Sequence, residues 1–257
     1  MKENKPELYT SLSPAMLHLY DLNQAIVVVI DVLRATSTIA TALHNGASCV
    51  IPVDSVERCI SLGKLTGAIT AGERDGRIAE GLQHGNSPFE YQRSFIENKT
   101  LVLTTTNGTR LLQMAVDNGA ETIVTGSFPN LTAVTNHLIA QNKDVILACA
   151  AWKDRVNLED ALFAGAVIDG VMEHFNIKCD ASSMAHALFI QAKPDIYAFV
   201  KNKQASHYLR LSRYGLEKDI QYCLTPDIAN ILPVYTNGKL LVSTCATASG
   251  EHHLVDV

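Results

Sequence analysis

Charged and hydroxyl side chains gather in a short segment that follows a run of aliphatic residues. Asp31 comes directly after the aliphatic run 26–30, and Arg34 and the hydroxyls of residues 36–38 share the same turn. A carboxylate there can bind a metal ion or attack a substrate, while Arg34 can hold a phosphate through its forked guanidinium. Free amides at a helix start add to anion binding. Asp31 as a plain helix cap is the alternative, but the crowding of Arg34 and three hydroxyls favours a functional turn.

A second polar segment, residues 104–110, follows the apolar run 100–103. Its threonines, asparagine, glycine and arginine supply hydroxyl donors, a flexible turn and a cation, which suits an oxyanion or a phosphate. A strand end followed by a capped helix is the alternative. The segment lacks the Gly-Lys-Ser/Thr ending of a Walker A loop and so does not indicate a P-loop nucleotidase. The candidate phosphate-binding residues here are Thr104, Thr105, Thr106, Asn107, Gly108 and Arg110.

Between these segments, glycines frame the acids and bases of residues 71–77, and a Gly-Asn-Ser-Pro turn occupies residues 85–88. An exposed loop is an equally good interpretation of either stretch taken alone. We single out Glu73 as a second metal carboxylate and a candidate catalytic residue beside Asp31 and Arg34. Arg74, Asn86 and Ser87 are further candidates for binding the phosphate.

An acidic pair, Glu159 and Asp160, begins a helical pattern after the apolar run 144–148. Carboxylates at a helix start are stabilised by the helix dipole, which is a sufficient structural reason for them. Hard oxygen ligands on three separate loops nevertheless suit Mg²⁺. The predicted Mg²⁺ ligands are Asp31, Glu73, Glu159 and Asp160. No His-x-x-x-His or Cys/His cluster supports zinc.

The runs 25–30, 100–103 and 144–148 are apolar throughout and are separated by helical patterns. Such strands are typical of a parallel sheet covered on both faces. The sequence therefore predicts an α/β fold, a three-layer α/β/α sandwich around a mainly parallel sheet. Open sheets of this kind bind ligands beyond the C-terminal ends of the strands, where the polar segments lie.

A faint internal repeat relates residues 45–55 to residues 118–127 at an offset of 73. The same offset places Thr104 against Asp31 and Thr109 against Thr36. Each unit would be a strand, a polar loop, a helix closed by Asn-Gly, and a second strand. An internal duplication is one hypothesis for this match.

No linker divides the chain, so we predict a single α/β domain over residues 1–257. Its motif-bearing part covers about 25–170, and a C-terminal elaboration covers about 180–257. Residues 180–203 have a helical pattern broken at Pro194, and a strand at 239–243 follows an Asn237-Gly238 turn.

The composition excludes several classes of protein. The 257 residues are 47% hydrophobic and 18% charged, with a net charge of −5, which rules out intrinsic disorder and gives no electrostatic case for nucleic acid. No apolar run reaches the length of a membrane span, and the polar N-terminus does not resemble a signal peptide. Six cysteines without a CxxC pair indicate reduced thiols and a cytoplasmic protein. A homodimer is compatible with the apolar composition, and a small anionic substrate is the expected partner.

Taken together, these segments resemble the 2-phosphosulfolactate phosphatase family. The matching residues are 29–36, 71–74, 85–88, 104–110 and 158–160, in the family's order, with a looser match as far as Asp219 and Pro233. The resemblance implies a Mg²⁺-dependent phosphatase with a three-layer α/β/α fold. It also implies the substrate 2-phospho-3-sulfolactate, hydrolysed to 3-sulfolactate and phosphate in coenzyme M biosynthesis.

Some positions depart from the family pattern. The family often has an acidic triplet before the Gly-Asn-Ser-Pro turn, where this chain has Gly-Leu-Gln-His at 81–84. The family's Cys-Ala-Gly motif ends in Ala151 here instead of glycine, and Trp152 follows it. Ser-His-Tyr at 206–208 replaces a Ser-x-His-Gly pattern. The metal and phosphate candidates are unaffected, so these changes bear on the organic half of the substrate, and a phosphatase of another small monoester is an alternative.

Two mechanisms are open for Asp31, which can attack phosphorus itself or hold the metal. Haloacid-dehalogenase phosphatases carry a second Asp two residues after the nucleophile, where this chain has Leu33. We therefore favour a metal-activated water. The rival functions are a non-catalytic anion-binding module and a phosphosugar lyase or isomerase.

Overall fold

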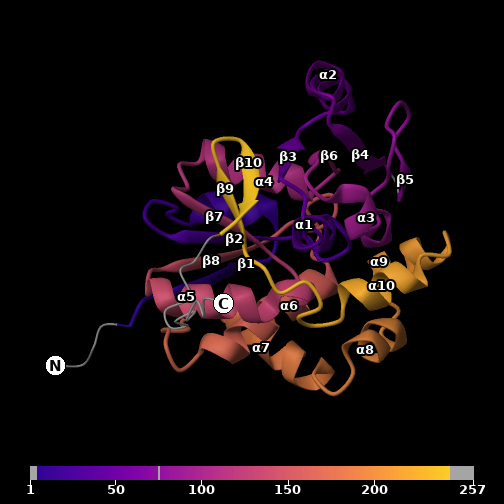
Figure 1. Ribbon diagram of the computed structural model, residues 1–257. Helices are drawn as coiled ribbons and strands as arrows, with labels where there is room; N and C mark the ends of the chain where they lie inside the picture. The colour runs from indigo at the N-terminus through magenta and orange to yellow at the C-terminus, as the bar shows by residue number, and fades with distance from the viewer. Residues whose placement is uncertain (1–4, 75, 244–257) are drawn as a thin grey trace, which may run out of the picture.

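A ten-stranded sheet forms the centre of the computed structural model, which describes residues 5–74 and 76–243 (Figure 1). The strand order is β1-β8-β2-β7-β9-β10-β3-β6-β4-β5. The strands are β1 Leu8–Ser11, β2 Ile26–Ile30, β3 Cys49–Val53, β4 Ile69–Arg74, β5 Arg77–Ile78, β6 Thr100–Thr104, β7 Thr122–Gly126, β8 Val145–Cys149, β9 Pro233–Thr236 and β10 Lys239–Val242.

The sheet consists of two parallel blocks joined by an antiparallel hairpin. Strands β1, β8, β2 and β7 pair in parallel, and so do β3, β6 and β4. The β9–β10 hairpin lies between β7 and β3 and pairs antiparallel with both. The prediction of a mainly parallel sheet is therefore confirmed.

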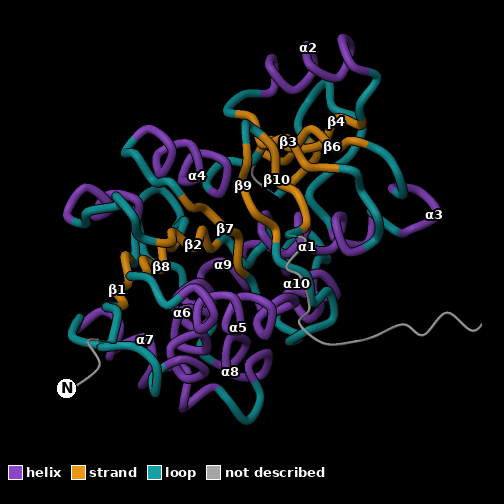
Figure 2. The backbone as a smooth tube through the Cα atoms, turned by 60° about the vertical axis from the view of Figure 1, so that its left-hand side comes forward, coloured by secondary structure: helices purple, strands orange, loops and turns teal. Residues whose placement is uncertain are grey.

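Helices cover both faces of the sheet. They are α1 Ala35–His44, α2 Val56–Thr66, α3 Arg93–Ile96, α4 Gly108–Asp117, α5 Leu131–Gln141, α6 Leu158–Val171, α7 Asp180–Ala192, α8 Ile196–Asn202, α9 Ser206–Ser212 and α10 Glu217–Cys223. Helix α4 lies on the opposite side of β2, β7 and β8 from α5, α6 and α7 (Figure 2). This is the predicted arrangement of three layers.

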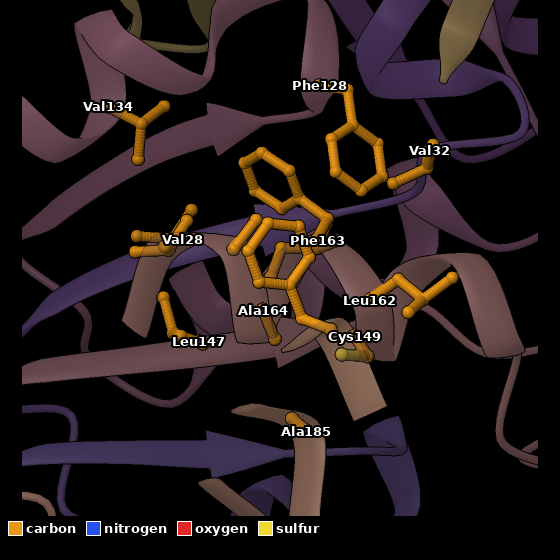
Figure 3. Packing of buried hydrophobic residues seen from close by; sticks show 14 of the residues in the cluster. Val28, Val32, Phe128, Val134, Leu147, Cys149, Leu162, Phe163, Ala164 and Ala185 are labelled. Carbon is orange, nitrogen blue, oxygen red and sulfur yellow. The ribbon is translucent and has the colours of Figure 1, made fainter. Parts of the chain in front are cut away.

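Strand β2 shows why the strands are apolar throughout. Val28 belongs to a core cluster that also contains residues of α6 and α7, while Val27 belongs to a second cluster with residues of α1 and α4. Alternate side chains of one strand are thus buried on opposite faces. On the first face, Phe163 of α6 meets Phe128 edge to face, with ring centroids 5.4 Å apart (Figure 3).

The internal repeat is present in the structure. Helices α1 and α4 both have ten residues and lie 73 positions apart, as do β3 and β7. Hydrogen bonds at the helix ends repeat as well, since Asn45 N–H donates to Thr41 O and Asn118 N–H donates to Met114 O. We call β2-α1-β3 the first unit and β6-α4-β7 the second unit.

The first strands of the two units are 74 positions apart, so the second polar loop is one residue shorter. Asp31 therefore corresponds to Thr105, and its predicted match to Thr104 is wrong by one position. The units also cross, because β2 pairs with β7 and β3 pairs with β6. This crossing brings the starts of α1 and α4 to the same place.

The residues after 180 form helices as predicted, with the break around Pro194 between α7 and α8. Asn237 and Gly238 both have positive φ, as a two-residue hairpin turn requires. The hairpin is central in the sheet, and Leu240 is fully buried. The C-terminal part therefore contributes two strands to the centre of the sheet. Among the described residues, no helix is long and apolar enough to cross a membrane.

Candidate active site

A small enclosed cleft lies where the C-terminal ends of β2, β4 and β6 face helix α9. It is narrow, with a volume of about 20 Å³. We call it the inner cleft. It is lined by Asp31, Leu33, Arg34, Glu73, Gly76, Asn86, Thr105, Asn107, His207, Arg210 and Leu211.

Asp31 is a buried carboxyl group in this cleft, only 7% exposed, and it forms no ion pair with a described residue. The backbone N–H of Ala35, at the start of α1, hydrogen-bonds to it. Burial is the main cause that raises the pKa of Asp31 to about 6; nearby Glu73 and Glu159 contribute to this rise, whereas His207 and the Ala35 N–H oppose it. A bound cation would favour the charged form of such a group, and perturbed carboxyls of this kind are typical of functional sites.

The start of α4 lies directly against Asp31. A Cβ atom at Gly108 would lie 2.7 Å from Asp31 Oδ2 and 2.9 Å from Ala35 Cβ, so only glycine fits. The N-termini of α1 and α4 therefore meet at the cleft, and both carry partial positive charge. Two converging helix starts suit an oxyanion.

Arg34 is buried at the mouth of α1 and forms an ion pair with Asp219 of α10. Both side chains are less than a tenth exposed. One guanidinium nitrogen is fixed by this carboxylate, and the remaining N–H groups can face an anion in the cleft. Asp219 thus positions the arginine from a distant part of the chain.

Glu73, at the end of β4, accepts hydrogen bonds from Gly76 N–H at 2.8 Å and from the Thr106 hydroxyl at 3.3 Å. Asn86 is 3% exposed, and its Oδ1 has no hydrogen-bond partner. An unpaired buried acceptor costs free energy unless a ligand satisfies it. Two carboxylates and one free amide oxygen thus line the same cleft.

The acidic pair of α6 has other partners. Glu159 Oε1 lies 2.6 Å from His207 Nδ1, and both side chains are buried. Asp160 accepts from Val32 N–H at 2.9 Å and from Ala151 N–H at 3.3 Å. Burial and the nearby carboxylates raise the pKa of Asp160 well above its usual value. Asp160 therefore ties the loops after β2 and β8 together.

The chain is similar to known proteins over most of its length. A family model described as 2-phosphosulpholactate phosphatase matches residues 11–238. The chain belongs to this family. Among its relatives, a protein of Thermotoga maritima named "Probable 2-phosphosulfolactate phosphatase" is 41% identical over 217 residues, which is 84% of this chain and 91% of the relative.

A protein of Clostridium acetobutylicum with the same name is 40% identical over 221 residues, covering 83% of this chain and 91% of the relative. One from Caldanaerobacter subterraneus subsp. tengcongensis is 39% identical over 227 residues, covering 87% and 92%. The resemblance drawn from the motifs is confirmed. The family consists of phosphoric monoester hydrolases, so the chain is an enzyme of that class.

The structure does not gather the four predicted metal carboxylates of this family member around one point. Asp31 and Glu73 line the inner cleft, whereas Glu159 and Asp160 do not. Within residues 5–74 and 76–243, no three His, Cys, Asp or Glu side chains form a group that could hold a metal ion. Glu159 instead pairs with His207 through Oε1, while its Oε2 is buried without a hydrogen-bond partner, and Asp160 accepts from backbone amides.

The predicted phosphate ligands also separate into groups. Arg34, Asn86, Thr105 and Asn107 line the inner cleft. Thr104, Thr106 and Gly108 flank it, and Arg74 donates to Thr104 Oγ1 at 3.2 Å. Two residues lie elsewhere: Arg110 is half exposed, 3.3 Å from Asp154, and Ser87 caps a short 3₁₀ helix with Glu90.

Helix α9 supplies residues that the sequence motifs did not assign to the site, namely His207, Arg210 and Leu211. His207 Nε2 lies 2.5 Å from Arg210 Nη2. Because arginine only donates, Nε2 is the acceptor, and Nδ1–H donates to Glu159. No local spacing marks these residues, although the altered Ser-His-Tyr motif at 206–208 contains the histidine.

Proposed function

We propose that the chain is a Mg²⁺-dependent phosphatase that hydrolyses 2-phospho-3-sulfolactate to 3-sulfolactate and phosphate, as a cytoplasmic enzyme of coenzyme M biosynthesis. The observation that best supports this proposal is the inner cleft, where Asp31 and Glu73 lie beside buried Arg34 and two converging helix starts. The names of the relatives supply the substrate. Free, buried thiols such as Cys59 and Cys149 suit a reducing compartment.

The donor set of the cleft fits Mg²⁺. This ion is usually held by one or two carboxylates, with water and substrate phosphate oxygens completing its coordination. Asp31 and Glu73 supply the carboxylates, and the unpaired Oδ1 of Asn86 supplies a third hard oxygen. Bound Mg²⁺ would neutralise charge on the phosphoryl oxygens.

The protein's own residues position the phosphoryl group. Arg34, held by Asp219, donates to its oxygens, and the backbone amides at the start of α4 add further donors. Catalysis of phosphoryl transfer depends mainly on such positioning and charge neutralisation. Leu33 and Leu211 form the apolar part of the cleft lining.

The reaction is attack by water in line with the ester bond. The water oxygen bonds to phosphorus and its proton passes to a carboxylate of the cleft, Asp31 or Glu73. The ester P–O bond breaks, the departing alcohol oxygen takes up a proton from solvent, and the carboxylate returns its proton to solvent. Leu33 stands where a second acid would serve an attacking Asp31, so the side chains favour water as the nucleophile.

Phosphate release tests this proposal. Protein stripped with EDTA is assayed on 2-phospho-3-sulfolactate and p-nitrophenyl phosphate, with and without added Mg²⁺. We expect stoichiometric phosphate and 3-sulfolactate from the first ester, only with Mg²⁺. Release from other esters but not from this one would replace the substrate, and a rearranged carbon skeleton would indicate a lyase or isomerase. Binding of the ester without any release would indicate an anion-binding module.

A further inference from the structure

A second cavity opens beside the inner cleft, and nothing in the proposed reaction at phosphorus uses it. Its volume is about 310 Å³, and it is lined by Trp152, Asn157, Ser206, His207, Arg210 and Arg213. His207 and Arg210 line both spaces, so the two are adjacent. We call it the outer cavity. Its size is at the lower end of the range for small-molecule sites.

The organic half of any substrate must lie outside the inner cleft, because that cleft encloses only about 20 Å³. Two neighbouring spaces could receive it. One is the outer cavity, and the other is a groove of about 370 Å³ beside Arg34 and Asn86. Glu90 lines the groove, whereas none of the Asp and Glu residues within 5–74 and 76–243 lines the outer cavity. An acidic group therefore favours the outer cavity.

The cations of the outer cavity have free donors. Arg213 makes no side-chain hydrogen bond or ion pair with any described residue. Arg210 Nε is buried without a hydrogen-bond partner, although Nη2 reaches His207. Buried guanidinium donors left unpaired are costly, and a planar, forked guanidinium matches carboxylate and similar oxyanions. Arg210 thus has a buried donor without a partner, and the exposed guanidinium of Arg213 lines the same cavity.

Trp152 forms an apolar wall of the cavity and is held there by a strained turn. Three non-glycine residues of this turn, Ala151, Lys153 and Asp154, have positive φ of 57°, 51° and 60°. Such conformations are costly and persist where the surroundings enforce them, often at functional sites. The guanidinium carbon of Arg210 lies 4.7 Å from the centre of the Trp152 ring, which orients both side chains.

We propose that the outer cavity binds the acidic group of the substrate that is remote from the phosphate, with Arg213 and Arg210 as its anion-binding residues and Trp152 as its apolar wall. This inference rests on the proposed phosphatase function of the inner cleft. The substrate class is a phosphate monoester with a second anion, a sulfonate or a carboxylate. The volume also accommodates a flat ring between the two charges.

Kinetics with matched esters tests this specificity. The assay compares wild type with Arg213→Ala, Arg213→Lys and Lys201→Ala. The substrates are 2-phospho-3-sulfolactate, 4-carboxyphenyl phosphate and phenyl phosphate, the last of which has no second anionic group. We expect Arg213→Ala to lower kcat/KM for the two acidic esters relative to phenyl phosphate by at least tenfold, mainly through KM. Arg213→Lys should recover part of the loss. Lys201→Ala removes an exposed charge of α8 that lines neither space and should leave the ratio unchanged.

Fluorescence gives a readout that needs no catalysis, because Trp152 is the only tryptophan of the chain. Titration with 3-sulfolactate should change its emission saturably, and Arg213→Ala should raise the half-saturating concentration at least tenfold. Phosphate alone should change it little.

The outcomes separate the two proposals. If wild type releases phosphate from none of the esters but 3-sulfolactate still changes the emission in an Arg213-dependent way, the proposed function fails and the anion site stands. If wild type is active but Arg213→Ala alters all esters equally and leaves the titration unchanged, the outer cavity is not the acid site. The acid site is likewise excluded if Lys201→Ala reproduces every effect of Arg213→Ala.

Discussion

The two repeated units share one scaffold but contribute different chemistry to the inner cleft. Their helices have the same length and end in the same hydrogen bonds. Their polar loops differ, because the first carries the charged Asp31 and Arg34, whereas the second carries the uncharged Thr105 and Asn107 and is one residue shorter. The repeated strands and helices therefore position the polar loops at the inner cleft, and the residue types of the loops determine what each unit can bind.

The crossing of the units explains how this division works. Since β2 pairs with β7 and β3 pairs with β6, the starts of α1 and α4 face each other across the cleft. The second unit offers backbone amides at a helix start that has glycine, Gly108, where the first has Ala35. The first unit offers the carboxylate and the guanidinium. An anion can then be held between a cation and two helix dipoles.

The largest effect should come from removing the charge of the first loop. Asp31→Asn is expected to lower kcat/KM for 2-phospho-3-sulfolactate by at least about 10³-fold, since both metal binding and proton transfer need the carboxylate. Thr105→Val, at the corresponding position, should lose about tenfold or less. Phosphate release under Mg²⁺ saturation measures both.

Circular dichroism melts of both variants serve as the control and should show folded proteins. Equal losses in the two variants would contradict the division of roles between the loops, and retained activity of Asp31→Asn would remove Asp31 from the reaction.

The buried charge also makes the first unit sensitive to pH. Burial raises the pKa of Asp31 from 3.8 to about 6 in the folded chain, where Glu73, Glu159 and His207 face it. A raised pKa means that the stability contributed by the neutral carboxyl is present below pH 4 and is lost as the pH rises through 6. In EDTA, the free energy of unfolding of Asp31→Asn should therefore exceed that of wild type by about 2 kcal/mol more at pH 7.5 than at pH 4.

Urea unfolding at several pH values measures this difference. Thr105→Val should show no such pH dependence relative to wild type, because threonine does not titrate. A flat difference between wild type and Asp31→Asn would mean that the Asp31 carboxyl is not held in a desolvated position. Added Mg²⁺ should reduce the difference, since a bound cation stabilises the ionised carboxylate.

Much of the fold could be predicted from local patterns. The strands of both parallel blocks are apolar on both faces, so 25–30, 100–103 and 144–148 were visible as buried strands. The Asn237-Gly238 turn marked its hairpin. Its insertion between β7 and β3 could not be predicted, because strand order depends on pairings between residues about 110 to 190 positions apart.

The site was predictable in part for the same reason. Asp31, Glu73, Asn86 and the 104–108 segment lie at strand ends or in the loops that follow strands, and their residue types indicate anion and metal chemistry. In the sequence, Glu159 and Asp160 are equally suitable as metal ligands. In the fold both are buried, and Glu159 contacts His207 while Asp160 accepts hydrogen bonds from backbone amides. Burial and long-range contacts decided these roles, as they decided the roles of Arg210 and Asp219, and no short motif records them.

A smaller effect should follow from closing the gap between the loops. Gly108→Ala places a methyl group 2.7 Å from Asp31 Oδ2 and 2.9 Å from Ala35 Cβ, so one of the loops must shift at a cost of about 2 kcal/mol. We expect kcat/KM to fall about 10- to 100-fold. The matched control is Ala35→Gly in the first unit, which removes a methyl group without a clash.

Stopped phosphate assays and urea unfolding measure the pair. The combination of Gly108→Ala with Ala35→Gly should recover part of the activity, since the second change removes one of the two contacts. No recovery together with a normal unfolding free energy would mean that the contact with Asp31 alone limits the approach of α4.

The smallest effect tests whether the two scaffolds are equal. In the first unit, the Thr36 hydroxyl donates to Asp31 O at 2.8 Å and accepts from Asp31 N–H at 3.2 Å. In the second unit, Thr109 does the same with Thr105, at 2.9 and 3.3 Å. Thr36→Val and Thr109→Val should each lower the free energy of unfolding by about 1 kcal/mol, within about 0.5 kcal/mol of each other. A clearly larger loss of unfolding free energy for Thr36→Val would show that the charged loop depends more on its threonine hydroxyl than the uncharged loop does. The two units would then share the hydrogen-bond geometry but differ in how much these bonds stabilise the fold.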